Sequence, residues 1–388
     1  MATVQNHGTA GPTLPQKLLR LNWPLVVLIV LVAGIGFAMQ YSVANGDVDP
    51  WARKQMIRFA VSFVGMLIVA MVDIRFWRGT AYAFYGLSLA LLIGVEVAGT
   101  VGMGAQRWID IGPIRLQPSE LMKIALVVAL ARYFHDLNPR RVRHILTLIP
   151  PLLMIALPAA LVVKQPDLGT AVLLSAGGII IMFLAGVSLW FFAALVASVG
   201  GLVYAVFISK GQDWALLKPY QYDRIAVFLN PELDPRGAGY HITQSKIAFG
   251  SGGMTGEGYL QGPQSRLDFL PEKHTDFIFT VLGEEFGLVG GLVLLGLYMV
   301  VLLFGLLTAM RIRHLFGRLV AAGVCMTFFA YFAINMAMVM GLAPVVGVPL
   351  PLVSYGGTSM LVILFGFGLL LSAQVHGRVT FPRRGPVV

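Results

Sequence analysis

Charged residues are scarce in this sequence. Only 12% of its 388 residues are Asp, Glu, Lys or Arg, whereas a typical soluble domain has about 25%. Hydrophobic residues make up 57%, and the mean hydropathy is +0.80. An ionisable side chain costs about 2.5 to 3.5 kcal/mol at the centre of a membrane helix, so this shortage is typical of a chain that lies mainly in lipid. The composition excludes a soluble enzyme and, despite a net charge of +10, a nucleic-acid-binding protein.

Cysteine is almost absent as well. The one cysteine, Cys325, lies in an apolar stretch. This excludes an internal disulfide and a cysteine-rich metal site. The sequence also lacks an internal repeat and a low-complexity segment, so it does not show the duplicated halves that many transporters have.

Apolar stretches near the 20 residues or so needed to cross a bilayer core occur ten times. They cover residues 22–43, 56–73, 80–100, 118–135, 144–163, 168–187, 189–209, 275–309, 317–343 and 353–375. The apolar core of the first is too long for a secretory signal, so we expect an uncleaved anchor. The pattern predicts an all-α polytopic membrane protein of about ten transmembrane helices. Its single transmembrane domain covers residues 22–376, with tails at 1–21 and 377–388.

Lysine and arginine in the short loops predict the orientation. With a cytoplasmic N-terminus, 14 of them lie in cytoplasmic segments and six in short outer loops, namely Arg53, Lys54, Arg58, Arg107, Arg115 and Lys164. We therefore expect both termini in the cytoplasm and the long connection 210–274 on the extracytoplasmic face. A connection of this length is usually functional. Within it we expect a short amphipathic helix at residues 242–248, broken by Gly250, Gly252 and Gly253.

Asp276 opens the eighth predicted span, directly after the long outer connection. One interpretation is a helix cap, because the free N–H groups and the dipole of a helix N-terminus stabilise a carboxylate. The other interpretation is a general base at the membrane–water boundary. Residue type and position do not decide between them.

Further ionisable residues lie near the same boundary. Glu120 and Lys123 begin the fourth span at i,i+3 spacing, so they can pair on one helix face, either as a structural ion pair or as part of a functional site. The predicted outer side also holds Arg107, Trp108, Lys164 and Asp167. Because the positive-inside rule disfavours cations there, the cations suit an anionic ligand such as a diphosphate.

Two other features have structural interpretations. Glu284 and Glu285 lie within the eighth span, where we expect them to form interhelical hydrogen bonds. Residues 341–359 are rich in proline and glycine. Non-helical backbone at membrane depth must be buried in protein or line a cavity, so we expect this segment to shape a groove.

Four runs within residues 104–359 resemble the SEDS family of bacterial cell-wall proteins, named for shape, elongation, division and sporulation. They are GAQRWIDIGPIRLQPSELMK, KQPDLGTA, LDPRGAGYHITQSKIAFGSGG with FLPEKHTDFIF, and PLPLVSYGGTS. The count of ten spans agrees with that of the family. Among its branches, the runs HITQSKIAFGSGG and APVVGVPLPLVSYGG are most similar to the elongation, or RodA-like, members.

The resemblance implies a peptidoglycan glycosyltransferase in the bacterial inner membrane. Its substrates would be lipid II and undecaprenyl-diphosphate-linked glycan, polymerised on the outer face during cell elongation. The essential acid of the family corresponds to Asp276, its intramembrane Glu–Lys pair to Glu120 and Lys123, and the acid of the KQPDLGT run to Asp167.

The resemblance also implies partners. The expected one is a class B penicillin-binding protein, a transpeptidase of the elongation machinery. A single-span partner would pack against small residues of the eighth span, such as Gly287, Gly290 and Gly291, or against the ninth span.

The implied reaction joins the C4 hydroxyl of an acceptor sugar to C1 of a lipid-diphosphate-linked donor, with inversion at C1. A single in-line displacement needs one base, for which we expect Asp276, and stabilisation of the departing diphosphate, for which we expect Arg107, Lys123 and Lys164. A divalent cation such as Mg²⁺ or Mn²⁺ would share the diphosphate charge, although no ligand spacing in the sequence identifies a metal site.

Two other functions stay open from the sequence. Broken helices and boundary charges also suit a lipid II flippase or transporter, although the charges gather towards one face rather than the midplane. A scaffold that only recruits a transpeptidase would make Asp276 dispensable.

Overall fold

The computed structural model describes residues 13–102, 105–111, 114–210, 212, 215, 219–234, 237–270, 272–379 and 381. The N-terminal half contains α1 (Leu14–Leu19), α2 (Trp23–Val43), α3 (Ala52–Met71), α4 (Ile74–Ala98), the strands β1 (Thr100–Gly102), β2 (Ala105–Ile111) and β3 (Ile114–Leu116), α5 (Pro118–Asp136), the 3₁₀-helix η1 (Ile145–Leu148), α6 (Ile149–Lys164) and α7 (Leu168–Leu184). The C-terminal half contains α8 (Leu189–Ser209), α9 (Pro219–Leu229), η2 (Pro231–Leu233), α10 (Ala238–Gly252), α11 (Pro263–Arg266), α12 (Ile278–Arg311), α13 (Leu315–Val339) and α14 (Gly357–Val375).

Eight helices of the described residues are long and apolar enough to cross a membrane: α2, α3, α4, α6 with η1, α8, α12, α13 and α14. Each overlaps a predicted span. The other two predicted spans correspond to α5, which carries Glu120, Lys123 and Arg132, and to α7, which has only 17 residues. The helical membrane architecture is therefore confirmed, and the count of ten spans stays a prediction.

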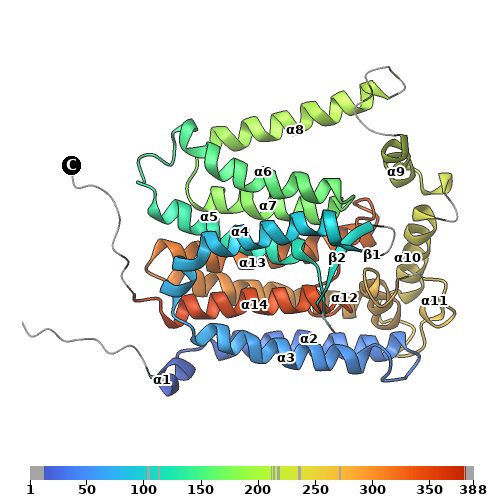
Figure 1. Ribbon diagram of the computed structural model, residues 1–388. Coiled ribbons are helices and arrows are strands. Elements are labelled where there is room, and N and C mark those ends of the chain that lie inside the picture. The colour runs from blue at the N-terminus through green and yellow to red at the C-terminus, as the bar shows by residue number, and fades with distance from the viewer. Residues whose placement is uncertain are drawn as a thin grey trace, which may run out of the picture.

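The helices differ widely in burial. Of the residues in the span of α14, 78% are buried inside the protein, against 0% in that of α8. The centre of the bundle is formed by α14 packed on α3 and α13, and by α5 packed on α4, α7 and α13. Figure 1 shows α8 apart from this centre, at the edge of the bundle. The apolar side chains of α8 are therefore left to face lipid.

A small antiparallel sheet lies between α4 and α5. Its strand order is β1-β2-β3, and β2 pairs with both neighbours. The sequence pattern did not predict this sheet, because β1 and β3 have only three residues each and so carry no alternation to recognise.

The long connection between α8 and α12 is partly helical. Its helix α10 packs against α12 and α13, burying Ile242, Ser245 and Ala248. The expected helix at 242–248 is therefore present but longer. Gly250 does not break it, because one glycine in a helix costs only about 1 kcal/mol. The helix ends at Gly253, whose φ is 51°, a conformation that glycine adopts readily.

The residues that follow α1 and those at the end of α14 lie at the same end of the bundle. The Gln374 side chain donates from Nε2 to the carbonyl of Arg20 (3.1 Å), and the N–H of Arg313 donates to the carbonyl of Gly377 (3.1 Å). The sheet and the helices α9, α10 and α11 lie at the opposite end (Figure 1). This arrangement agrees with termini on the same side of the membrane.

Candidate active site

Asp276 lies in the turn that leads into α12, at the end of the bundle that carries the sheet. Its side chain is half-buried, and its carboxylate forms no hydrogen bond or ion pair with any residue that the structure describes. Burial, together with the negative charges of Glu272 and Asp167, raises the pKa of this carboxyl to about 7. The N-cap position of α12 is Phe277, without a side-chain cap. The capping interpretation is therefore wrong, and the carboxylate is left free to act as a base.

The segment 341–356 passes beside this carboxylate. It is non-helical, as its prolines and glycines predict. Gly347 has a φ of 68°, and a Cβ placed on it would lie 3.5 Å from Oδ2 of Asp276. A Cβ at position 347 would be in van der Waals contact with the carboxylate and would occupy the space beside Oδ2, which glycine leaves open.

Glu120 and Lys123 form the pair that their spacing predicts. The Lys123 Nζ lies 2.6 Å from Oε1 of Glu120, and both side chains are almost fully buried. Tyr331 of α13 closes the group, because its hydroxyl donates to Oε2 of Glu120 and its ring lies 4.3 Å from the Lys123 ammonium. All charges of this cluster are compensated internally, which is the arrangement a buried ion pair needs to persist.

Asp167 is the N-cap of α7. Its carboxylate accepts hydrogen bonds from the N–H (3.1 Å) and hydroxyl (3.0 Å) of Thr170 and from Nε2 of Gln117 (3.2 Å). The guanidinium of Arg107 lies 3.8 Å from Oδ2 and also donates to the carbonyls of Gln165 (3.1 Å) and Pro166 (2.5 Å). Arg107 therefore holds the α6–α7 turn in place and retains partial exposure.

Two predicted site residues do not contact this group in the described structure. The Lys164 side chain is 71% exposed and its Nζ lies 2.5 Å from Oε2 of Glu96 on α4. Trp108 follows Arg107 on β2, at a β-bulge in the pairing with β1, and its side chain forms no hydrogen bond or ring contact with the group among the described residues. The structure thus brings together Asp276, Asp167, Arg107, Glu120 and Lys123, and does not add Lys164 or Trp108 to this group.

Two contacts join the parts of the site. On α13, Tyr331 and Asn335 are four residues apart and so share one helix face: the first contacts the Glu120–Lys123 pair, and the second donates to the carbonyl of Asp276 (2.8 Å). At the start of α7, Gly169 packs so closely on Val346 that a Cβ would lie 2.4 Å from its carbonyl oxygen. Asp167 and Asp276 therefore flank the same short segment, 346–348.

Several residues beside Asp276 were not predicted from the sequence to belong to the site. The side chains of Gln40, Asn335 and Ser354 all donate to the backbone just before α12. Gln40 and Asn335 are polar amides inside apolar spans, and that signal was present in the sequence, because such residues are expensive in a membrane and usually functional. Their partners were not predictable, since they lie more than 50 residues away along the chain.

Glu284 and Glu285 have the hydrogen-bonding role expected of them. The carboxylate of Glu284 accepts from the N–H groups of Gln264 (2.7 Å) and Ser265 (3.2 Å) at the start of α11. That of Glu285 accepts from the hydroxyl of Ser42 on α2. The two acids thus fasten the long connection and α2 to α12.

Gly287 breaks α12 for the same connection. It has φ 61° and ψ −160°, and a Cβ on it would lie 2.5 Å from the backbone nitrogen of Gly256. The backbone around the break pairs with residues 253–258 through four hydrogen bonds, for example Leu288 N–H to the carbonyl of Gly253 (3.0 Å). The space that a side chain at position 287 would occupy is therefore filled by residues 254–256 of this chain and is not open to a partner helix.

A metal site is not evident. No group of three or more His, Cys, Asp or Glu side chains among the described residues could hold a metal ion. Mg²⁺ often needs only one or two carboxylates together with substrate phosphates, but the Asp167 carboxylate is already bound by Thr170, Gln117 and Arg107, so the described residues do not present a free pair of carboxylates for it.

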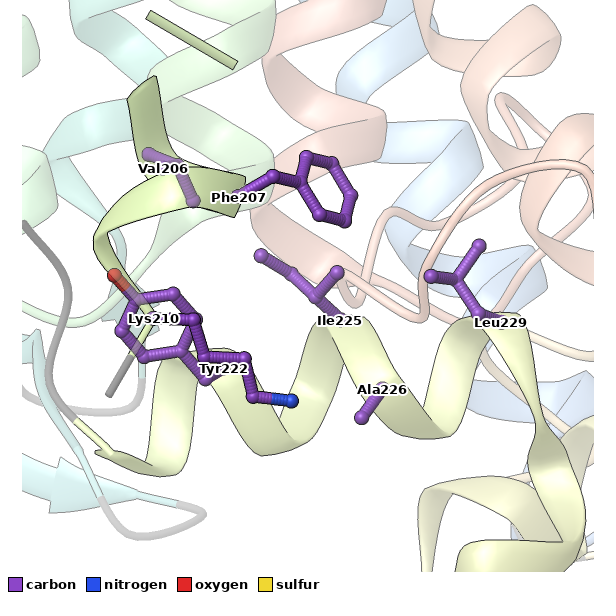
Figure 2. A pocket seen from close by; sticks show the side chains of 7 residues that line it. All are labelled: Val206, Phe207, Lys210, Tyr222, Ile225, Ala226 and Leu229. Carbon is purple, nitrogen blue, oxygen red and sulfur yellow. The ribbon is translucent and has the colours of Figure 1, made fainter. Parts of the chain in front are cut away.

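A small pocket of about 130 Å³ lies between the end of α8 and α9. Figure 2 shows its lining, which is apolar except for Lys210 and Tyr222. The hydroxyls of Tyr222 and Ser209 are 2.7 Å apart and fix α9 against the last turn of α8. None of the predicted site residues lines this pocket, so it is separate from the candidate active site.

Known proteins resemble this chain over most of its length. Residues 16–379 match the sequence model of the cell cycle proteins FtsW, RodA and SpoVE. The peptidoglycan glycosyltransferase MrdB of Escherichia coli is 42% identical over 92% of this chain and 94% of its own, and the peptidoglycan glycosyltransferase RodA of Treponema pallidum is 36% identical over 92% and 98%.

Solved structures match too. A chain from a peptidoglycan synthase complex that coordinates polymerization and crosslinking superposes with a TM-score of 0.77 at 31% identity, covering 91% of this chain and 97% of that one. The rod shape determining protein RodA of Thermus thermophilus superposes with a TM-score of 0.66 at 27% identity, covering 91% and 96%.

Proposed function

This chain belongs to the FtsW, RodA and SpoVE family of cell cycle proteins and is a peptidoglycan glycosyltransferase of the elongation type, and we propose that Asp276 is the general base with which it polymerises lipid II. The observation that carries this proposal is the state of the Asp276 carboxylate. It is half-buried, has no hydrogen-bond partner among the described residues, and has its pKa raised to about 7. A base works best when its pKa lies near the working pH.

The chemistry follows from that position. The carboxylate takes the proton of the acceptor C4 hydroxyl as its oxygen attacks C1 of the donor sugar, and the bond from C1 to the lipid diphosphate breaks with inversion at C1. The pKa matters here because a carboxyl near 7 is a stronger base than an ordinary aspartate, and about half of it is still ionised at neutral pH. Gly347 leaves the room beside Oδ2 that the hydroxyl needs.

The departing diphosphate needs positive charge. Arg107 supports this role best, because its guanidinium is partly exposed beside Asp167. Lys123 contributes only if it leaves its buried pair with Glu120, and Lys164 only if it leaves Glu96. Mg²⁺ or Mn²⁺ would supply further charge when bound with the diphosphate.

Location and partner complete the proposal. The Asp276 end of the bundle faces the outside of the bacterial inner membrane, because the opposite end carries α1, the end of α14 and most of the short-loop arginines. The similarity to a chain from a complex that coordinates polymerization with crosslinking supports a class B penicillin-binding protein as partner in the elongation machinery.

The test is lipid II polymerisation by purified protein, alone and with the partner. Asp276→Asn should lower the rate by about 100-fold to 10,000-fold, the usual contribution of a general base, while the protein stays folded. EDTA should also slow the reaction if a divalent cation takes part. A folded Asp276→Asn protein with the wild-type rate would refute the proposal, and one that moves lipid II across proteoliposome membranes without polymerising it would favour the flippase alternative.

A further inference from the structure

Two buried side-chain amides hold the backbone that carries Asp276. Gln40 of α2 donates from Nε2 to the carbonyls of His274 (2.9 Å) and Val353 (3.2 Å). Asn335 of α13 donates from Nδ2 to the carbonyls of Asp276 (2.8 Å) and Val348 (2.7 Å). Each amide thus bridges the segment 274–276 to the segment 346–354, and the two come from helices that pack against α12.

A hydroxyl fills the position between them. The Ser354 hydroxyl donates to the carbonyl of Thr275 (2.5 Å) and accepts from the N–H of Leu350 (2.7 Å). The carbonyls of His274, Thr275 and Asp276 are therefore all bound by side chains, from three separate elements. Such binding restricts the direction in which the Asp276 side chain leaves the backbone.

These two amides do more than complete their own hydrogen bonding, because only their nitrogen atoms are bonded. Gln40 and Asn335 are both fully buried, and Oε1 of the first and Oδ1 of the second have no hydrogen-bond partner among the described residues. The neighbours of each nitrogen are carbonyl oxygens, which only accept, so turning either amide would lose two bonds. Leaving a buried acceptor unpaired costs free energy, and in return the two amides make four bonds, two to the segment 274–276 and two to the segment 346–354.

We infer that Gln40 and Asn335 are positioning residues of the transferase: by bridging segments 274–276 and 346–354 they fix the Asp276 carboxylate in its half-buried place facing Gly347. The inference rests on the proposed role of Asp276 as the base. Neither amide touches the carboxylate itself, so both act through the backbone. Loosening the segment lets water reach the carboxylate, and its pKa then moves down from about 7 towards the ordinary range of aspartate.

The chain offers a matched control. Gln374, at the far end of α14, also donates from Nε2 to a backbone carbonyl, that of Arg20 (3.1 Å), and its Oε1 is likewise without a partner in the described part of the chain. Gln40→Met and Gln374→Met therefore remove the same kind of contact, an amide bond to a backbone carbonyl, although Gln374 is less buried and makes one such bond instead of two. Only the first loosens the segment that carries Asp276.

The experiment compares these variants in lipid II polymerisation over a range of pH. Gln40→Met is expected to lower kcat by about 10-fold to 100-fold with little change in KM, because a displacement near 1 Å costs about that much. The acid limb of its kcat profile should move to lower pH. Gln374→Met should keep the wild-type kcat and pH profile. Asn335→Leu, on the other helix, should repeat the result of Gln40→Met.

Hydrogen exchange gives a readout that does not depend on activity. The N–H of Tyr355 donates to the carbonyl of His274 (2.8 Å), so it should exchange faster in Gln40→Met and not in Gln374→Met. If Gln40→Met fails to fold, Ser354→Ala takes its place. This variant deletes a single oxygen, so we expect the same changes in kcat, pH profile and exchange rate, each of them smaller.

The outcomes separate the two claims. An unchanged kcat, pH profile and exchange rate in Gln40→Met and Asn335→Leu would overturn the inference even if Asp276→Asn is inactive. An equal loss in Gln374→Met would overturn it as well, because the effect would then be general. If Asp276→Asn is fully active, the proposed function fails, and faster exchange confined to Gln40→Met and Asn335→Leu would still show that these amides hold the segment.

Discussion

The Asp276 turn and the Glu120–Lys123 cluster are two acidic sites near each other, built in opposite ways. In the cluster the side chains are paired: the carboxylate of Glu120 is bound by Lys123 and by the Tyr331 hydroxyl. At Asp276 the side chain is unpaired in the described structure, and the backbone carbonyl is bound instead. A carboxylate with all its partners in place has little left to offer a substrate, whereas one held only through its backbone keeps its oxygens for chemistry.

Breaking the cluster should give the largest loss of stability. Lys123→Met leaves the buried Glu120 charge without its cation, and the expected cost is about 3 to 5 kcal/mol. The double variant Glu120→Gln with Lys123→Met removes both charges and should recover much of it. Thermal unfolding in detergent measures both. Asp276→Asn is the comparison, and it should not lower the unfolding temperature, because it removes a charge that burial disfavours.

If Lys123→Met proves as stable as the wild type and loses only activity, the cluster is not the closed structural pair described above. Its lysine would then act on the substrate.

Crowding Asp276 should give a moderate effect. Gly347→Ala places a Cβ near Oδ2 of Asp276 and forces a non-glycine residue into a φ of 68°, a strain of about 1 to 2 kcal/mol. We expect polymerisation to slow by about tenfold, with the substrate KM raised. Gly250→Ala, where a Cβ has open space, is the control and should keep full activity. Equal rates for both variants would mean that the room beside Asp276 is not used.

The pH profile should show a smaller change. Asp276 acts as a base only when ionised, so the rate should rise with pH towards about 7 and level off above it. Glu272→Gln removes one negative charge that raises this pKa, so the acid limb should move to lower pH. Glu257→Gln, an exposed acid of the same connection that does not raise this pKa, should leave the limb in place. A limb that moves to higher pH in Glu272→Gln would contradict the electrostatic account.

The smallest effect is expected at Lys164. Its exposed pair with Glu96 lies outside the compact group, and exposed pairs contribute about 1 kcal/mol or less. Lys164→Ala should therefore change kcat and KM by less than about twofold, whereas Arg107→Ala should do more, since it also releases the α6–α7 turn. A rise in KM for Lys164→Ala as large as that for Arg107→Ala would restore Lys164 as a diphosphate ligand.

Much of the fold followed from local signals. Apolar stretches predicted the helices because length and hydropathy act within one segment, and the i,i+3 spacing predicted the Glu120–Lys123 pair because both residues share one helix. The sheet was not predicted because two of its three strands have only three residues each, too few for a pattern. Gly287 was misassigned to a partner because the sequence does not show that residues 254–256 pack on it.

The sequence by itself determined the class of this protein, a helical membrane enzyme of a known family, and the residue types of its site. Composition and motif are carried by the order of the residues and need no partner. Only the tertiary structure decided which charges are paired and which are free, because pairing depends on residues far apart along the chain. It placed Asn335 on the carbonyl of Asp276 and Lys164 on Glu96, so it separated the acid with a raised pKa from the cations that merely lie on the same side of the membrane.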